Sequence, residues 1–280
     1  MNGTAGRVET SARALGSVFT RALVAEFTKI TTLRSWWIGV TVVLVLTVYF
    51  AHMGASLLVE LLDTLDDGSF TDLDGSRVPL EEGVLDTVLS SPYQSVALFL
   101  PLVIAIAVGQ EYRGGQISTS VTAVPSRLRL IAAKLVTVSV LSVLVCAAVY
   151  ALSNVVLLLM LPPEGVAIVL TFEALLVLPR VMLYSVCLSI VAAALTGLFR
   201  NTLFALFTIV AILVLGVSGL LLAFVPLLHN AMPMIAAQSF LFGHQAEGMP
   251  SEATGVLVLL GWAMVTTVLW AAAFTKQDVA

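Results

Sequence analysis

Long apolar runs alternate with short polar segments along the chain. Several runs reach the ~20 residues that an α-helix needs to cross the hydrocarbon core of a bilayer, about 30 Å thick. Lipid offers the backbone no hydrogen bonds, so an uninterrupted helix is the structure that such a run predicts. The pattern predicts six spans, at residues 36–53, 93–110, 135–161, 174–199 (or a shorter span that starts near Val181), 202–225 and 255–274.

The composition also indicates a membrane protein. Hydrophobic residues make up 59% of the 280 residues, charged residues make up 11%, and the mean hydropathy is +1.06. Soluble domains are about 45–50% apolar and about 25% charged. Six wholly apolar helices in a chain of this length would leave too little polar surface to cover them in water. We therefore expect an all-α membrane protein with a single transmembrane domain at residues 1–280.

Basic residues are concentrated on one side of the predicted spans. Short cytoplasmic segments are enriched in Lys and Arg, and with a cytoplasmic N-terminus every basic residue except Arg77 and Arg180 lies inside. Carboxylates gather instead in an acidic outer loop at residues 54–91. The net charge of −4 therefore reflects two opposite poles and gives no indication of nucleic-acid binding. We expect cytoplasmic N- and C-termini in a lipid bilayer, the inner (plasma) membrane, and a second outer segment at residues 226–254.

Enzymatic chemistry finds little support in the residues. The motif GVSG at Gly216–Gly219 is similar to the serine motif of rhomboid-type intramembrane proteases, but such chemistry needs a base within hydrogen-bond reach of Ser218. The last span contains no histidine, and the three histidines of the chain lie at a span end or in outer loops. No H-E-x-x-H spacing is present. We expect no catalytic residue, no metal site and no cofactor in this chain.

If the chain is a transporter, transport requires an energy source. The central parts of most predicted spans hold no ionisable group that would couple transport to an ion. Glu173 and Arg180 lie about two turns apart toward the outer side, which predicts an outer ion pair or, as an alternative, a substrate gate. Pro179 between them indicates a helix break before the span proper. The chain has no G-x-x-x-x-G-K-[ST] loop for nucleotide phosphates, so a partner would have to hydrolyse the nucleotide.

Residues 12–35 predict an amphipathic helix that lies on the inner surface. Apolar residues between Leu15 and Leu33 occupy about half of the helical wheel. Glu26 and Lys29 fall on this apolar half, one turn apart. This favours a face packed on protein, where Glu26 pairs with Lys29 or another base. The alternative is a surface helix whose charges extend outward to water.

The inner loop at residues 111–133 is longer than two antiparallel spans require. It begins in the stretch GQEYRGGQ, where Gly114 and Gly115 allow the preceding helix to end. A short helix at residues 117–123 follows, and Pro125 limits it. The extra length predicts a docking element for a partner.

Three stretches together resemble the ABC-2 type permease subunits of bacterial ABC exporters. They are LVAEFTKITTLRSWW before the first span, GQEYRGGQISTSVTAVPSRLRLIAAK between the second and third, and FTKQDVA at the end of the last. The resemblance covers essentially the whole chain. Gln116 is a departure, because the family often has threonine there.

The resemblance implies a complex of two permease chains, identical or related, with two copies of a separate ATPase subunit that binds ATP and Mg. The surface helix and the coupling helix between spans two and three would rest on that ATPase. The residues implied are Glu26, Lys29 and Arg34 in the surface helix and Glu111, Tyr112, Arg113, Gly114, Gly115, Gln116, Ile117, Pro125, Arg127 and Lys134 in the coupling loop.

Glu111 stands directly at the inner end of the second predicted span. We hypothesise that it pairs with Lys29, Arg34 or Arg113 and sets the angle between surface helix and coupling loop. The apolar spans favour outward movement of a hydrophobic or amphiphilic cargo such as a drug, a peptide antibiotic or a lipid. A membrane scaffold or immunity-type protein without transport is the alternative.

Overall fold

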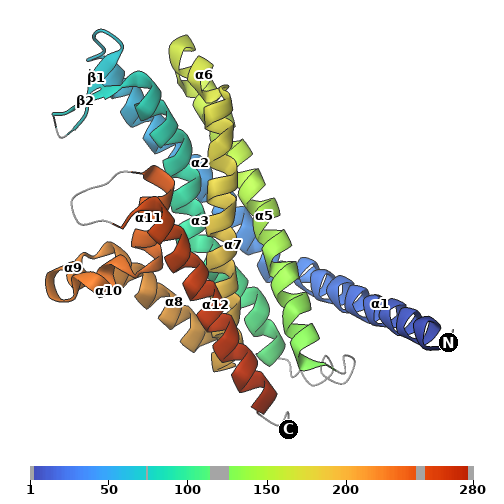
Figure 1. Ribbon diagram of the computed structural model, residues 1–280. Helices are drawn as coiled ribbons and strands as arrows, with labels where there is room; N and C mark the ends of the chain where they lie inside the picture. The colour runs from blue at the N-terminus through green and yellow to red at the C-terminus, as the bar shows by residue number, and fades with distance from the viewer. Residues whose placement is uncertain (1–2, 74, 114–125, 244–249, 277–280) are drawn as a thin grey trace.

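The computed structural model describes residues 3–73, 75–113, 126–243 and 250–276, and it is a bundle of long helices with a small hairpin at one end (Figure 1). Within these described residues, five helices are long and apolar enough to cross a membrane. They are α2 (Arg34–Leu62), α3 (Leu80–Arg113), α5 (Arg127–Met160), α7 (Phe172–Phe199) and α12 (Glu252–Lys276). The prediction of an all-α, membrane-type protein is confirmed at this level.

Shorter elements surround these helices. α1 (Gly3–Thr32) extends away from the bundle at the end where α3 finishes and α5 begins (Figure 1). The antiparallel strands β1 (Ser69–Thr71) and β2 (Arg77–Pro79) connect α2 to α3. The remaining helices are α6 (Pro163–Val169), α8 (Thr202–Val217), α9 (Leu220–Phe224), α10 (Pro226–Asn230) and α11 (Pro233–Phe242).

The predicted span at 202–225 is not one helix. α8 ends after 16 residues, about 24 Å, because Gly219 adopts a left-handed conformation with φ of 65° and turns the chain. α9 and α10 then project sideways from the bundle (Figure 1). α11 resumes the direction of α8 and packs on α12, with most of its side chains buried. Two shorter apolar helices, α8 and α11, together run along the bundle here, and we call this pair the divided crossing.

The acidic segment at 54–91 is helical over most of its length. α2 continues to Leu62 and α3 starts at Leu80, so only the hairpin and its flanking turns connect them. Glu81 and Glu82 lie in the first turn of α3, where carboxylates interact favourably with the positive end of the helix dipole. The two helices are thus longer than the spans predicted from hydropathy alone.

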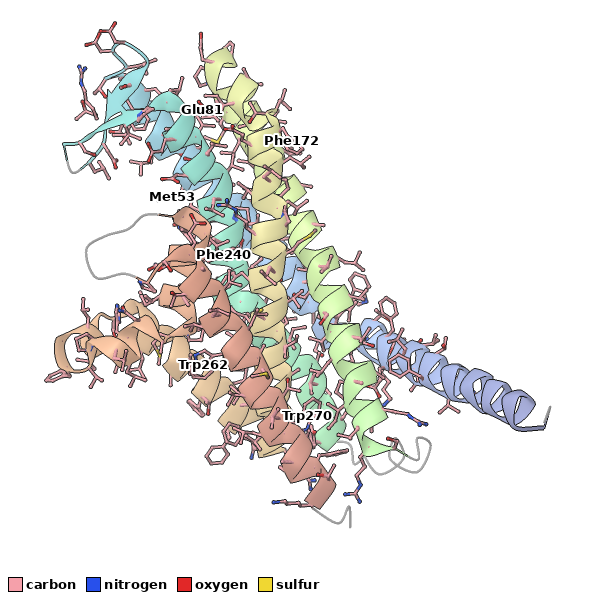
Figure 2. All side chains as sticks on the ribbon, in the orientation of Figure 1. Met53, Glu81, Phe172, Phe240, Trp262 and Trp270 are labelled. Carbon is pink, nitrogen blue, oxygen red and sulfur yellow. The ribbon has the colours of Figure 1, made fainter. Side chains whose placement is uncertain are left out.

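Small residues allow the central helices to approach closely. Ala192, Ala193 and Ala194 of α7 are almost completely buried, and membrane helices use such residues to bring their backbones together. At Gly197 an added Cβ would overlap the indole ring of Trp270 on α12. Trp270 is 1% exposed and lies in the lower half of α12 (Figure 2).

We predict that Gly197→Ala destabilises the protein by about 1–3 kcal/mol, because the methyl group would displace the fixed Trp270 ring. Thermal unfolding of the detergent-solubilised protein measures the effect. Gly261→Ala is the matched control, since its added Cβ meets no neighbour within 4 Å. Equal melting temperatures for the two variants would contradict close packing at Gly197.

Candidate functional site

Four charged side chains from three helices meet at the end of the bundle where α3 finishes and α5 begins. Lys134 Nζ of α5 lies 2.5 Å from Glu26 Oε2 of α1 and 2.5 Å from Glu111 Oε1 of α3. Lys29 Nζ donates to the other oxygen of Glu26 at 2.7 Å. We call these four residues the charge cluster. Glu26, Glu111 and Lys134 are 1%, 5% and 2% exposed, so three of the four members are buried, whereas the Lys29 side chain is 32% exposed.

The local sequence explains why these side chains point inward. Lys134 is preceded on its helix by Leu130 and Ile131, one turn earlier, and both are buried. It therefore lies on the buried face of α5. Glu26 similarly shares a buried face of α1 with Ala22 and Ile30. The charged groups of Glu26 and Lys134 are therefore held among apolar neighbours.

The cluster contains two carboxylates and two ammonium groups, so its formal charges balance. Burial by itself raises the pKa of Glu26, but Lys134 and Lys29 together outweigh it and hold the pKa below its usual value. The stability that this provides is fully present above the ordinary pKa of glutamate and is lost as the pH falls through the lowered value. A buried ion pair is expensive to break, because removal of one partner strands the other charge.

The structure shows a partner of Glu111 that the hypothesis did not name. Glu111 binds Lys134, and neither Lys29 nor Arg34 reaches it. Lys29 is engaged by Glu26, and Arg34 is exposed at the start of α2. The side chain of Arg113 lies outside the described residues. The helical phase of Lys134 with Leu130 and Ile131 indicates that its side chain is buried, but it does not identify the carboxylate that it meets.

Two other predicted residues make contacts between helices. Arg127 Nη1, at the start of α5, donates to the carbonyl oxygens of Phe274 at 2.9 Å and Thr275 at 3.3 Å, in the last turn of α12. The Tyr112 hydroxyl lies 3.5 Å from the carbonyl oxygen of Gly197 on α7. These contacts gather α3, α5, α7 and α12 beside the charge cluster. The predicted residues Gly114, Gly115, Gln116, Ile117 and Pro125, and the short helix at 117–123, lie outside the described residues.

The predicted outer ion pair is not formed. Among the ion pairs of the described residues, none joins Glu173 to Arg180; both line a cavity of about 710 Å³ at the hairpin end of α3 and α7. The predicted break at Pro179 is also absent, since α7 is continuous from Phe172 to Phe199. Proline is tolerated in such helices because neighbouring elements satisfy the freed backbone groups.

Neither a protein-family model nor a curated protein matches this chain. The fold and the site define a helical protein of multi-pass membrane type, with a charge cluster that joins α1 to the bundle.

We predict that Lys134→Met lowers the free energy of unfolding by about 3–5 kcal/mol, because Glu26 and Glu111 would remain buried without their shared partner. The triple variant Lys134→Met/Glu26→Gln/Glu111→Gln should regain most of this loss, since it strands no carboxylate. Thermal unfolding followed by tryptophan fluorescence measures both. Arg129→Met, a charge removal on the same helix, is the control. A triple variant no more stable than Lys134→Met would contradict the electrostatic explanation.

Proposed function

We propose that this chain is the transmembrane permease subunit of an ATP-driven exporter of the ABC-2 type. The observation that carries the proposal is the charge cluster, which fastens α1 to both helices that flank residues 114–125. The segment between α3 and α5 was predicted to be the docking element for the ATPase. A surface helix attached to both spans that flank the docking element can receive a force from that element and pass it into the bundle.

Coupling depends on the free energy that would be needed to slide α1, α3 and α5 past one another. If α1, α3 and α5 moved separately, Lys134 would leave at least one carboxylate in a low-dielectric interior. The three helices therefore move as one unit when the connection between α3 and α5 is pushed. Arg127 extends this unit to the last turn of α12. A displacement at the inner end would in this way reach four helices together.

The energy must come from another chain, because the sequence contains no phosphate-binding loop. Two copies of a separate ATPase subunit, which bind ATP and Mg, would supply it. The proposed location is the inner (plasma) membrane with both termini in the cytoplasm, and transport runs outward.

A second permease chain is part of the proposal, and the divided crossing supports it. Trp262 Nε1, near the middle of α12, donates to the carbonyl oxygen of Ala231 at 2.7 Å. The turn after α10 therefore lies close to the mid-depth of the bundle, as the position of Trp262 in Figure 2 also indicates. Irregular backbone at this depth is tolerated only where protein covers it or where it lines a water-filled cavity.

The side chains of α9 and α10 indicate that protein, rather than a water-filled cavity, lies against this segment. Phe224 and Leu227 are 76% and 84% exposed, and the other exposed side chains of the two helices are also apolar. In a dimer with its two-fold axis along the membrane normal, each residue meets the partner at its own depth. A second copy, or a related chain, would thus bury this projecting segment.

We predict that single cysteines at Leu220, Phe224 or Leu227 form disulfides between two copies in native membranes under mild oxidation. The projecting segments of two chains would lie close to the two-fold axis. Gel electrophoresis without reductant measures the dimer. Met264→Cys, exposed at similar depth on α12, is the control, and the native Cys146 and Cys187 are buried. Labelling of Leu227→Cys by a membrane-impermeant maleimide, without cross-linking, would indicate a water-filled cavity instead and contradict the dimer contact.

We predict that Glu111→Gln lowers transport-coupled ATP hydrolysis by roughly tenfold while the complex still assembles, since coupling free energies of about 1–3 kcal/mol are typical. The measurement uses the chain and its co-purified ATPase in proteoliposomes. Glu60→Gln, an exposed carboxylate of α2, is the control. Full hydrolysis by an assembled Glu111→Gln complex would contradict the coupling role. A biological effect that survives an inactive ATPase would indicate a non-transporting scaffold.

A further inference from the structure

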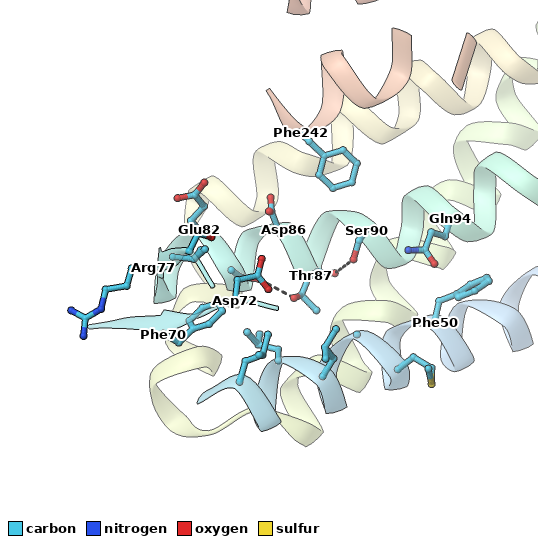
Figure 3. A pocket seen from close by; sticks show the side chains of 18 of the residues that line it. Phe50, Phe70, Asp72, Arg77, Glu82, Asp86, Thr87, Ser90, Gln94 and Phe242 are labelled. Atoms are coloured by element: carbon cyan, nitrogen blue, oxygen red, sulfur yellow. Dashed lines mark hydrogen bonds between the residues drawn. The ribbon is translucent and has the colours of Figure 1, made fainter. Parts of the chain in front are cut away.

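A cavity of about 940 Å³ opens between α2, α3 and the hairpin at the end of the bundle opposite the charge cluster (Figure 3). We call it the α2–α3 groove. Its two long walls come from two adjacent helices and differ in chemistry, one being polar and the other apolar. This contrast is the feature that points to a ligand.

The polar wall is a regular ladder on α3. Glu82, Asp86, Ser90 and Gln94 recur at every fourth residue and so share one helix face. The ladder runs from the first turn of α3 toward the middle of the bundle over about 18 Å. It begins with two carboxylates and ends with a neutral amide. A polar stripe on a membrane helix is costly against lipid and normally faces a functional cavity.

The apolar wall is supplied by α2. Tyr49, Met53 and Leu57 follow one another at a spacing of one turn, and they are 55%, 53% and 43% exposed. Phe242 of α11 faces the groove from the opposite side, beside the polar ladder (Figure 3). Aromatic rings on two sides can contact both an apolar chain and a cation.

The charges at the open end are predominantly negative. Asp72, Glu82 and Asp86 line the groove together with one base, Arg77, and Arg77 forms an ion pair with Asp66 at 3.0 Å. The neighbouring 710 Å³ cavity shares Glu82 and Asp86 and adds two further carboxylates, Glu81 and Glu173, against one more base, Arg180. The electrostatic field at this end of the groove therefore attracts cations.

A metal ion does not account for the lining. Among the described residues no group of three or more His, Cys, Asp or Glu side chains could hold a metal ion. A small hydrated cation would also leave the apolar wall of α2 unused, and a neutral lipid would gain nothing from the negative charge of this lining. The ligand that uses both walls has a positive group at one end and an apolar remainder.

We propose that the α2–α3 groove binds a cationic amphiphile, with its ammonium or other organic cation beside Glu82 and Asp86 and its apolar part along Tyr49, Met53 and Leu57. As a statement about cargo this rests on the proposed function. Binding itself requires only the chain, since every residue of the site lies in one protomer. The groove would hold the ligand near the outer end of the bundle, where it leaves the apolar wall for water.

The test measures binding of a fluorescent lipophilic quaternary ammonium compound to the full-length chain in nanodiscs, beside a neutral analogue of equal apolar size. The double variant Glu82→Gln/Asp86→Asn should weaken cation binding by about tenfold, as expected for loss of contacts to charged groups. Its matched control is Glu60→Gln/Asp63→Asn, which removes the same charge from exposed positions at the same end of α2. The neutral analogue should bind more weakly than the cation and be unaffected by either double variant.

A second variant covers the case in which the double variant does not fold. Met53→Lys places a positive charge on an exposed position of the apolar wall and should weaken cation binding through repulsion. Unchanged cation binding in the folded groove variants, an equal loss in the Glu60/Asp63 control, or equal affinity for the neutral analogue would overturn the proposal. Cation binding that depends on the groove but is accompanied by no ATP-dependent transport would overturn the proposed function and leave this inference standing.

Discussion

The two contacts of Lys134 with Glu26 and Glu111 are the constraint on which the rest of the molecule depends. They join helices that are far apart in the sequence, and all three groups are removed from water. Ionic groups in such a place are stable only while every charge has its partner. A separation of α1, α3 and α5 at this end would therefore leave a buried charge without its partner. The opposite end contains two cavities and a surplus of carboxylates, so the bundle combines a fixed end with an open one.

Along the described part of the bundle, uncharged contacts rather than ion pairs hold the helices together. α7 contacts α3, α5 and α12 through small and medium side chains, and Gly197 gives Trp270 the space it needs. Ser142 of α5 also shares hydrogen bonds with Ser185 and Ser189 of α7, at 2.6 and 2.9 Å. Such contacts hold membrane helices together because lipid provides no hydrophobic drive between them. Charged groups hold the helices together at the end where α3 finishes and α5 begins, whereas close packing and hydroxyl pairs hold them together along the rest of the bundle.

Hydropathy predicted the class of the protein and most of its long helices, because runs of apolar residues have few other stable structures in lipid. It failed at 202–225, since the residues on both sides of Ser218 and Gly219 are equally apolar and only the backbone conformation separates α8 from α9. Glu173 and Arg180 were expected to pair from their spacing, but two turns separate them by about 10.5 Å along the axis. The partner of Glu111 required a three-dimensional contact between α3 and α5.

The divided crossing also determines how many times the chain runs along the bundle. Five helices that each ran the length of the bundle would leave the start of α2 and the end of α12 at opposite ends of it. In Figure 1 the start of α2 and the end of α12 lie at the same end of the bundle, which requires an even number of passages. α8 and α11 together make the additional passage, although neither is long enough to make it alone. Two helices that hydropathy counts as incomplete therefore bring the end of α12 back to the end of the bundle where α2 starts.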